Sequence, residues 1–277
     1  MMFNQTQKVF KAGTMAVDIG GNGRPAMDLL VRELEQLTPA QVAGGNNYPT
    51  LTNQFFAEVE DPGSFLPLVQ ELPGASALRT NIIQHFFFLS RLNQDWIGTG
   101  FAVVPDDAQS VAGPLYRFSW TNRYSPMSLS WQFRQALGRP VADIRTNFSR
   151  IAEGVVHLRL RTFDPHGVPL ISGIQQNGNL FPVLPFGSST WVNNATGQVR
   201  TASGKVLDEV DCYFWNNAVP ASLELELGIL EPKVFQRYRA IGAGTTAATA
   251  YLSNHVAQVH LFRQRIPIRN VDFSAYQ

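Results

Sequence analysis

The chain has 277 residues, of which 44% are hydrophobic and 16% charged, so it can form a globular core. Its formal net charge of +1 excludes a broad basic field for nucleic acid, and we expect no nucleic-acid partner. The single cysteine, Cys212, excludes an internal disulfide and a cysteine-rich zinc site. No stretch approaches the roughly 20 apolar residues of a membrane-spanning helix.

The beginning of the chain is predicted to be helical. Phe3, Phe10 and Val17 recur every seven residues, which would form a narrow apolar stripe along a helix. The glycine-rich residues 20–23 should bend that helix. We therefore predict a stem helix over residues 1–38, with a kink at 20–23.

The second half of this stem has the stronger helical pattern. In residues 26–37 most of the apolar side chains fall on one side of a helix, as expected where a helix packs on a core. Leu29 falls away from that side, next to charged residues. The pair Thr38-Pro39 predicts the end of the helix.

Most of residues 39–230 is predicted to form β-structure. The candidate strands cover residues 54–60, 80–92, 114–123 and 154–164. In the last of these, apolar residues alternate with histidine and arginine, the period of a strand with one buried face. A helix followed by many antiparallel strands predicts a single α+β domain in which the helix packs on the sheet.

The end of the chain combines two strand patterns with a helical one. Glu224 and Glu226 alternate with leucines, which is typical of a strand. Residues 232–258 are predicted to be a helical insertion, because Glu231-Pro232 interrupts the strand pattern and Ala247, Ala250, Leu252 and Val256 suit a helix with small-residue packing. Residues 259–268 are predicted to be the final strand.

The two glutamates allow a catalytic interpretation and a structural one. Side chains two apart on a strand lie about 7 Å from each other, within the range of paired glycosidase carboxyls. However, both would project from one surface, without a cleft between them. We therefore interpret Glu224 and Glu226 as the solvated face of a strand, to which Arg263 and Arg265 of a neighbouring strand could pair.

Other residues give weaker indications of a catalytic or ligand-binding site. The glycines at 20–23 resemble a phosphate loop, but a dinucleotide fingerprint needs a strand before them, and the upstream residues look helical. The five histidines show no metal-ligand spacing. Cys212 stands among aromatic residues and fits a small buried hydrophobe better than a nucleophile. The tryptophans are dispersed, which favours packing over a sugar-binding platform.

Three segments together resemble a J-type minor pseudopilin, one of the prepilin-type cleavage/methylation proteins of type II secretion or type IV pilus-like systems. The segment "AMDLLVRELEQL" (26–37) resembles the lower stem helix of that family. The segments "AVPASLELELGI" (218–229) and "VHLFRQRIPIRN" (259–270) are similar to its last two strands. The family's leader peptide and apolar start are missing, so we expect a soluble portion that lacks the N-terminal membrane segment.

The resemblance implies a structural role. It implies a pilin-like α+β fold, with a stem helix on an antiparallel sheet and a helical insertion before the final strand. It implies a subunit at or near the tip of a pseudopilus, on the periplasmic face of the inner membrane, with other minor pseudopilins as partners. No catalytic residue, cofactor or metal is implied. The expected partner-binding residues are Phe3, Phe10, Val17 and Leu29.

A rival hypothesis from another class remains open at this point. The chain could be a secreted β-rich carbohydrate-active or ligand-binding protein, which would need an aromatic cleft with converging Asp or Glu residues. A glycan array would separate the two hypotheses. A phage or surface structural protein is a third alternative that no repeat supports.

Overall fold

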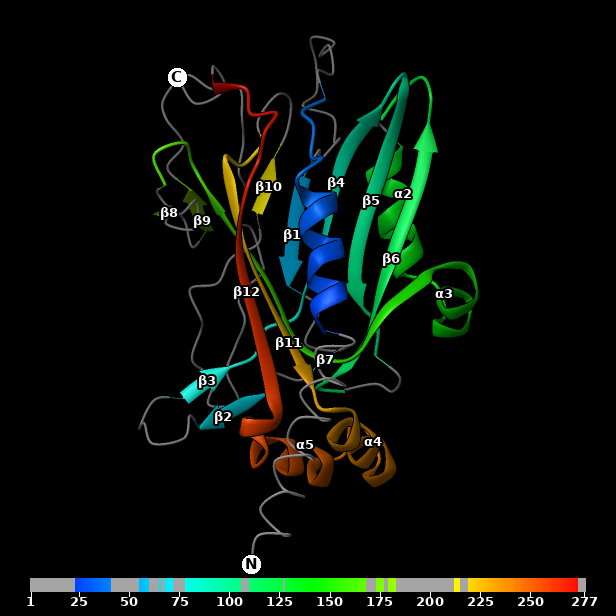
Figure 1. Cartoon of the computed structure of the whole chain (residues 1–277), viewed down its shortest axis with the longest axis vertical. Helices are drawn as coiled ribbons and strands as arrows, with labels where there is room; N and C mark the ends of the chain where they lie inside the picture. Colours follow the sequence, from blue (N-terminus) through cyan, green and yellow to red (C-terminus); the bar gives the residue numbers. More distant parts are fainter. Residues whose placement is uncertain are drawn as a thin grey trace, which may run out of the picture.

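A computed structural model of the chain shows one large sheet with helices around it (Figure 1). It describes residues 23–40, 55–59, 65, 68–71, 78–105, 110–126, 128–167, 173–176, 179–182, 212–214 and 219–273. The sheet contains β1 (Phe55–Val59), β4 (Gln84–Leu92), β5 (Asp95–Val103), β6 (Gly113–Asn122), β7 (Ser149–Phe163), β10 (Cys212–Phe214), β11 (Ser222–Leu230) and β12 (Val259–Pro267). These strands are antiparallel in the order β10-β1-β4-β5-β6-β7-β11-β12, and they curl into a half-barrel.

The long strand β7 explains much of the curl. Its residues up to Val155 pair with β6, and its later residues pair with β11. Two backbone amides of that later part turn to the start of β4: Leu158 N donates to Ile82 O at 2.8 Å, and Leu160 N donates to Gln84 Oε1 at 2.6 Å. The beginning of β4 therefore returns to β7, and the strands between them must bend. Irregular pairing between β6 and β7 adds to the bend, as β-bulges do.

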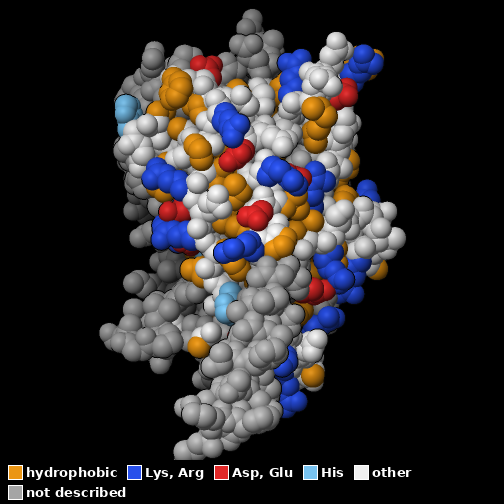
Figure 2. All heavy atoms as spheres, in the orientation of Figure 1, with side chains coloured by type: hydrophobic (Ala, Val, Ile, Leu, Met, Phe, Trp, Pro, Cys, Tyr) orange, Lys and Arg blue, Asp and Glu red, His pale blue; other side chains and the backbone are white. Residues whose placement is uncertain are grey.

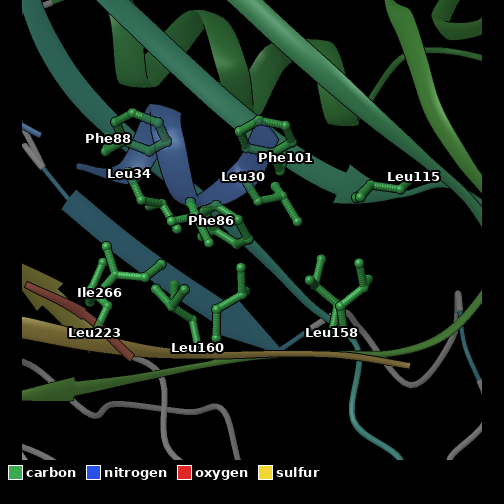
Figure 3. Packing of buried hydrophobic residues seen from close by; sticks show 14 of the residues in the cluster. Leu30, Leu34, Phe86, Phe88, Phe101, Leu115, Leu158, Leu160, Leu223 and Ile266 are labelled. Carbon is green, nitrogen blue, oxygen red and sulfur yellow. The ribbon is translucent and has the colours of Figure 1, made fainter. Parts of the chain in front are cut away.

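The first helix, residues 23–34, lies in the concave side of the sheet (Figure 3). Its apolar residues recur at helical spacing and pack among leucines and phenylalanines of the strands. The buried residues of this helix are Ala26, Met27, Leu30, Val31 and Leu34. The helix ends where Leu37 forms a β-bridge with Ser90 and Thr38 N donates to Leu89 O at 2.9 Å. These contacts give hydrogen-bond partners to the backbone where the chain leaves the helix.

Two helices cover the convex side. They are α2 (Leu129–Leu137) and α3 (Val141–Asn147). Phe133 of α2 packs into a cluster of aromatic residues from β1, β4 and β6. The helix approaches β5 closely at two glycines: a Cβ atom at Gly98 would lie 2.8 Å from Leu129 Cβ, and one at Gly100 would overlap the Phe133 ring. The glycines of β5 thus make room for α2.

This close approach predicts a cost for Gly100→Ala. The added methyl group would displace the Phe133 ring, which is itself fully buried, so we expect unfolding to become easier by about 1–3 kcal/mol. Denaturant unfolding followed by circular dichroism measures the change. The matched control is Gly138→Ala, because Gly138 has a negative φ and the nearest atom to its added Cβ is 3.7 Å away. Equal unfolding midpoints for the two variants would contradict the proposed close packing.

Further helices close one end of the half-barrel. Between β11 and β12 the chain forms α4 (Pro232–Ile241), α5 (Thr246–Ser253) and the short η1 (Val256–Gln258). Tyr238 of α4 is fully buried, and its hydroxyl accepts a hydrogen bond from Val111 N at 3.0 Å. Gln70 of β2 (Val69–Glu71) donates to Leu252 O of α5 at 3.0 Å. The strand β2 pairs only with β3 (Leu78–Thr80) among the described residues, and β8 (Gly173–Gln176) pairs with β9 (Asn179–Pro182).

The expectation of a pilin-like fold, with a stem helix packed on a sheet, is wrong. The structure is mostly an antiparallel sheet curled into a half-barrel, with few helices. The physical reason is the pairing of β7 with the start of β4, which bends the sheet around a short helix. The expected kink at 20–23 lies outside the described residues except for Gly23, which is helical.

Candidate functional site

A row of charged side chains crosses the convex face of β7, β11 and β12. The strand register sets Glu226 between Arg159 and Arg263, and Glu224 between Arg161 and Arg265. The leucines that alternate with them point to the opposite face and join the main core. We call the set His157, Arg159, Arg161, Glu224, Glu226 and Arg263 the arginine–glutamate cluster.

The two glutamates of this cluster are ion-paired and largely buried. Glu226 lies 3.2 Å from His157 Nε2, 3.3 Å from Arg263 Nε and 3.7 Å from Arg159 Nη1. Glu224 accepts hydrogen bonds from Arg161 and from Arg263. Glu226 is only 8% exposed and the side chain of Glu224 is 15% exposed, so the interpretation of both residues as a solvated strand face is corrected. The second expected partner, Arg265, bonds to the Ser222 hydroxyl instead.

The protonation states of the cluster follow from these contacts. His157 Nδ1 accepts a hydrogen bond from Ile82 N at 3.0 Å, so its Nε2 carries the proton that faces Glu226. The hydrogen bond that His157 donates to Glu226, together with the charges of Arg159 and Arg161, lowers the pKa of Glu226 to about 2 despite its burial. Burial and the neighbouring Arg161 lower the pKa of Arg159 to about 10.

These pKa values argue against acid–base catalysis by the cluster. A general acid works best when its pKa lies near the working pH, and Glu226 is ionised far below neutrality. The hydrogen bond that Arg263 donates to Glu224 raises the pKa of Arg263, which holds this arginine in its charged form. The arrangement therefore joins the three strands by ion pairs.

A second buried charge cluster joins α2 to the sheet. Glu58 of β1 lies 2.9 Å from His85 Nε2 of β4, and both residues are 8% exposed. Arg134 of α2 binds both carboxylate oxygens of Glu58, with its Nη1 at 3.0 Å from Oε2. The same guanidinium lies 4.3 Å from the ring centre of Phe56. Because these residues lie far apart in sequence, no local pattern could have predicted this cluster.

Of the remaining sequence candidates, the structure describes Cys212 but not the three apolar residues of the predicted stripe. Cys212 is buried in β10, as expected of a small apolar residue. Phe3, Phe10 and Val17 lie outside the described residues. In the part of the chain that the structure describes, no three His, Cys, Asp or Glu side chains are grouped as metal ligands would be. None of the described helices is long and apolar enough to span a membrane.

The first helix exposes a face that points away from the sheet, and we call this its open face. Leu29 lies half-buried on it, between the exposed Asp28 and Arg32. Ion pairs hold both flanks of the helix: Glu33 bonds to Arg117 of β6 at 2.9 Å. On the other side, Glu35 lies 3.4 Å from an arginine that follows β12. Figure 2 shows apolar, basic and acidic side chains mixed on this side of the molecule.

Comparison of the chain with protein-family models, with curated proteins and with solved structures finds no match. The residues and their contacts are therefore the basis for a functional proposal. Two buried charge clusters join structural elements, and one helix presents a mixed surface.

Proposed function

We propose that the chain is an assembly subunit, a minor pseudopilin of a type II secretion pseudopilus or a related pilus-like filament. The observation that carries this proposal is the meeting of the three resembling segments in one core. Leu30 and Leu34 of the first segment share a hydrophobic cluster with Leu223 of the second and Ile266 of the third. Segments that lie far apart in sequence thus form one structural unit.

Polar contacts join the same segments at the end of the helix. Asn270, the last residue of the third segment, donates to Leu37 O of the first at 3.2 Å. Arg269 lies 3.4 Å from Glu35. At the other end of the helix, Phe262 of β12 fills the space beside Gly23. The proposal rests on this unit and on the open face of the helix.

The mechanism is association of subunits through the open face. A half-buried leucine surrounded by exposed charges is the kind of surface that a partner helix can cover, with the charges setting orientation. Phe3, Phe10 and Val17 would extend this surface toward the start of the chain. A membrane segment upstream would hold the mature protein at the periplasmic face of the inner membrane.

This function predicts that Leu29→Glu weakens binding to other minor pseudopilins by about tenfold or more, because a charge would enter the centre of the contact. Affinity measured by biolayer interferometry against candidate pseudopilins of the same genome tests it. The matched control is Trp131→Glu, which changes an exposed apolar residue of α2 on the convex side. Unchanged binding by Leu29→Glu, or an equal loss in the control, would contradict the proposed surface.

A further inference from the structure

The last strand, β12, forms an open edge of the large sheet. Within the described part of the chain it pairs with β11 alone and stands at one end of the strand order. It has nine residues, whereas β10 at the other end has three, and Figure 1 shows it running along the length of the sheet. Side chains are exposed on both of its faces, with Leu261 and Arg265 on the convex face and Gln264 on the concave one. An edge of this length has room for a further strand.

Two backbone hydrogen bonds fix which groups of this edge point away from β11. Glu231 N donates to Gln258 O at 3.0 Å, and Ile268 N donates to Ala221 O at 3.1 Å, one bond at each end of the β11–β12 pair. Both bonds use an even-numbered residue on the β12 side. Because the backbone groups of an antiparallel strand point alternately to its two sides, the odd-numbered residues of β12 direct theirs away from β11. We call the following amides, which no described residue accepts a hydrogen bond from, the outward donors: Leu261, Arg263 and Arg265.

The side chains along this edge are basic. No Asp or Glu occurs between Glu231 and Asp272 in the sequence. Among the described residues, Arg265 contacts neutral groups: its guanidinium donates to the Ser222 hydroxyl at 3.2 Å and lies 4.4 Å from the ring centre of Phe163. Neither contact neutralises the positive charge of Arg265, and its side chain is exposed. A strand added at the edge therefore brings its side chains next to an accessible cation.

The charge of the edge selects between two kinds of partner. Pairing of the whole of β12 with the β12 of a second copy would set Arg263 opposite its own counterpart, and like charges directly opposite each other are unfavourable. The neighbour that β12 already has shows the favourable case, because β11 sets Glu224 opposite Arg265 and Glu226 opposite Arg263. A strand with acidic residues at alternate positions repeats this arrangement on the open side.

We propose that β12 binds an extended, acidic segment of another protein, which adds a strand to the eight-stranded sheet. The backbone of the added strand bonds to the outward donors, and its acidic side chains face Arg265 on the convex side. Main-chain hydrogen bonds hold the segment, and the charge selects its sequence. This inference goes beyond the proposed function and does not rest on it, because it concerns a different surface from the open face of the first helix.

The first test is amide hydrogen exchange followed by NMR. The probe is a synthetic peptide in which valine and glutamate alternate. When the peptide is added, exchange should slow at the outward donors of Leu261, Arg263 and Arg265, because they gain acceptors. Exchange at Phe262 and Gln264 should change little, because the amides of even-numbered residues already face β11. Peptide binding without this alternation would place the peptide elsewhere and overturn the proposal.

The second test reverses one charge, with peptide affinity measured by fluorescence anisotropy. Arg265→Glu should weaken binding of the valine–glutamate peptide by about fivefold or more, because an attraction becomes a repulsion. The same variant should bind a valine–lysine peptide more tightly than the unmodified chain does. The matched control is Arg139→Glu, which makes the same change of net charge on an exposed residue that follows α2. An unchanged peptide preference in Arg265→Glu, or an equal change in the control, would rule out the acidic partner.

The third test removes one outward donor and leaves the ladder with β11 intact. Leu261→Pro deletes an N–H that points away from β11, a place where an edge strand tolerates proline. The matched control is Leu261→Ala, which loses the same side chain and keeps the N–H. The proline variant should bind the valine–glutamate peptide about fivefold more weakly than the alanine variant. Equal affinities, in variants whose thermal unfolding by circular dichroism matches, would show that the edge does not bind the peptide.

Two further outcomes separate this proposal from its alternatives. If a second copy occupied the edge, the outward donors would be protected in the free protein, and sedimentation would show a dimer; this result would overturn the proposal. Leu29→Glu should leave peptide binding unchanged, because Leu29 lies on the first helix. Loss of peptide binding in that variant would move the site to the open face, whereas failure of peptide binding alone would leave the assembly function untouched.

Discussion

Replacement of Glu226 by glutamine should destabilise the protein by about 3–5 kcal/mol, because it leaves a buried arginine without its opposite charge. Glu226 faces His157 and Arg159 of β7 and Arg263 of β12, and Arg159 is only 8% exposed. Denaturant unfolding at neutral pH measures the loss. A change below about 1 kcal/mol would show that the cluster contributes little.

The same variant should also change the response to acid. The pKa of Glu226 is lowered in the folded state from 4.5 to about 2, so the folded protein favours the ionised carboxylate. The stability that this provides is complete above pH 4.5 and is lost as the pH falls toward 2. The difference in unfolding free energy between the unmodified chain and Glu226→Gln should therefore shrink over that range.

The control for this experiment is Glu153→Gln. Glu153 also pairs with an arginine, but its side chain is 38% exposed, and such surface pairs contribute about 0.2–1 kcal/mol. An acid response in Glu226→Gln that matches that of the unmodified chain would contradict the depressed pKa.

Replacement of Phe133 by alanine should cost about 3–5 kcal/mol, the usual loss for removal of a large buried aromatic side chain. Phe133 is fully buried, and its ring centre lies 5.2 Å from that of Phe118, 5.8 Å from Phe87 and 6.0 Å from Phe56. A cavity at this place would also loosen α2 from the sheet. Thermal and denaturant unfolding both measure the effect.

Trp131→Ala is the matched control on the same helix, because Trp131 is 61% exposed and its removal leaves no cavity. Its unfolding free energy should stay within about 0.5 kcal/mol of that of the unmodified chain. Comparable losses in the two variants would mean that the contact between α2 and the sheet does not depend on the Phe133 ring.

Local patterns predicted several elements and missed others for identifiable reasons. Alternation over 154–164 and 223–227 indicated strands; β7 covers the first of these as far as Phe163, and β11 covers the second. The strand β5 went unpredicted, because Gly98 and Gly100 weaken a strand pattern and their role appears only in the contact with α2. The helix α2 was missed as well, although its buried Leu129, Phe133 and Ala136 have helical spacing.

The contacts of the candidate sites could likewise be predicted only in part. Complementary charges on two alternating strands were enough to anticipate that arginines pair with Glu224. Burial of these groups could not be predicted from the pattern, because an alternating strand looks the same whether its polar face meets water or ion partners. The Glu58, His85 and Arg134 cluster needed three elements to meet in space.

The sequence by itself determined the helix within residues 26–37 and the strands β7 and β11, together with their apolar faces, because side-chain spacing decides these locally. Only the tertiary structure decided that the sheet curls around the first helix, because the curl depends on hydrogen bonds from Leu158 and Leu160 to a segment far away in the chain. It likewise decided that Leu29 lies on an open face and that Glu226 is buried.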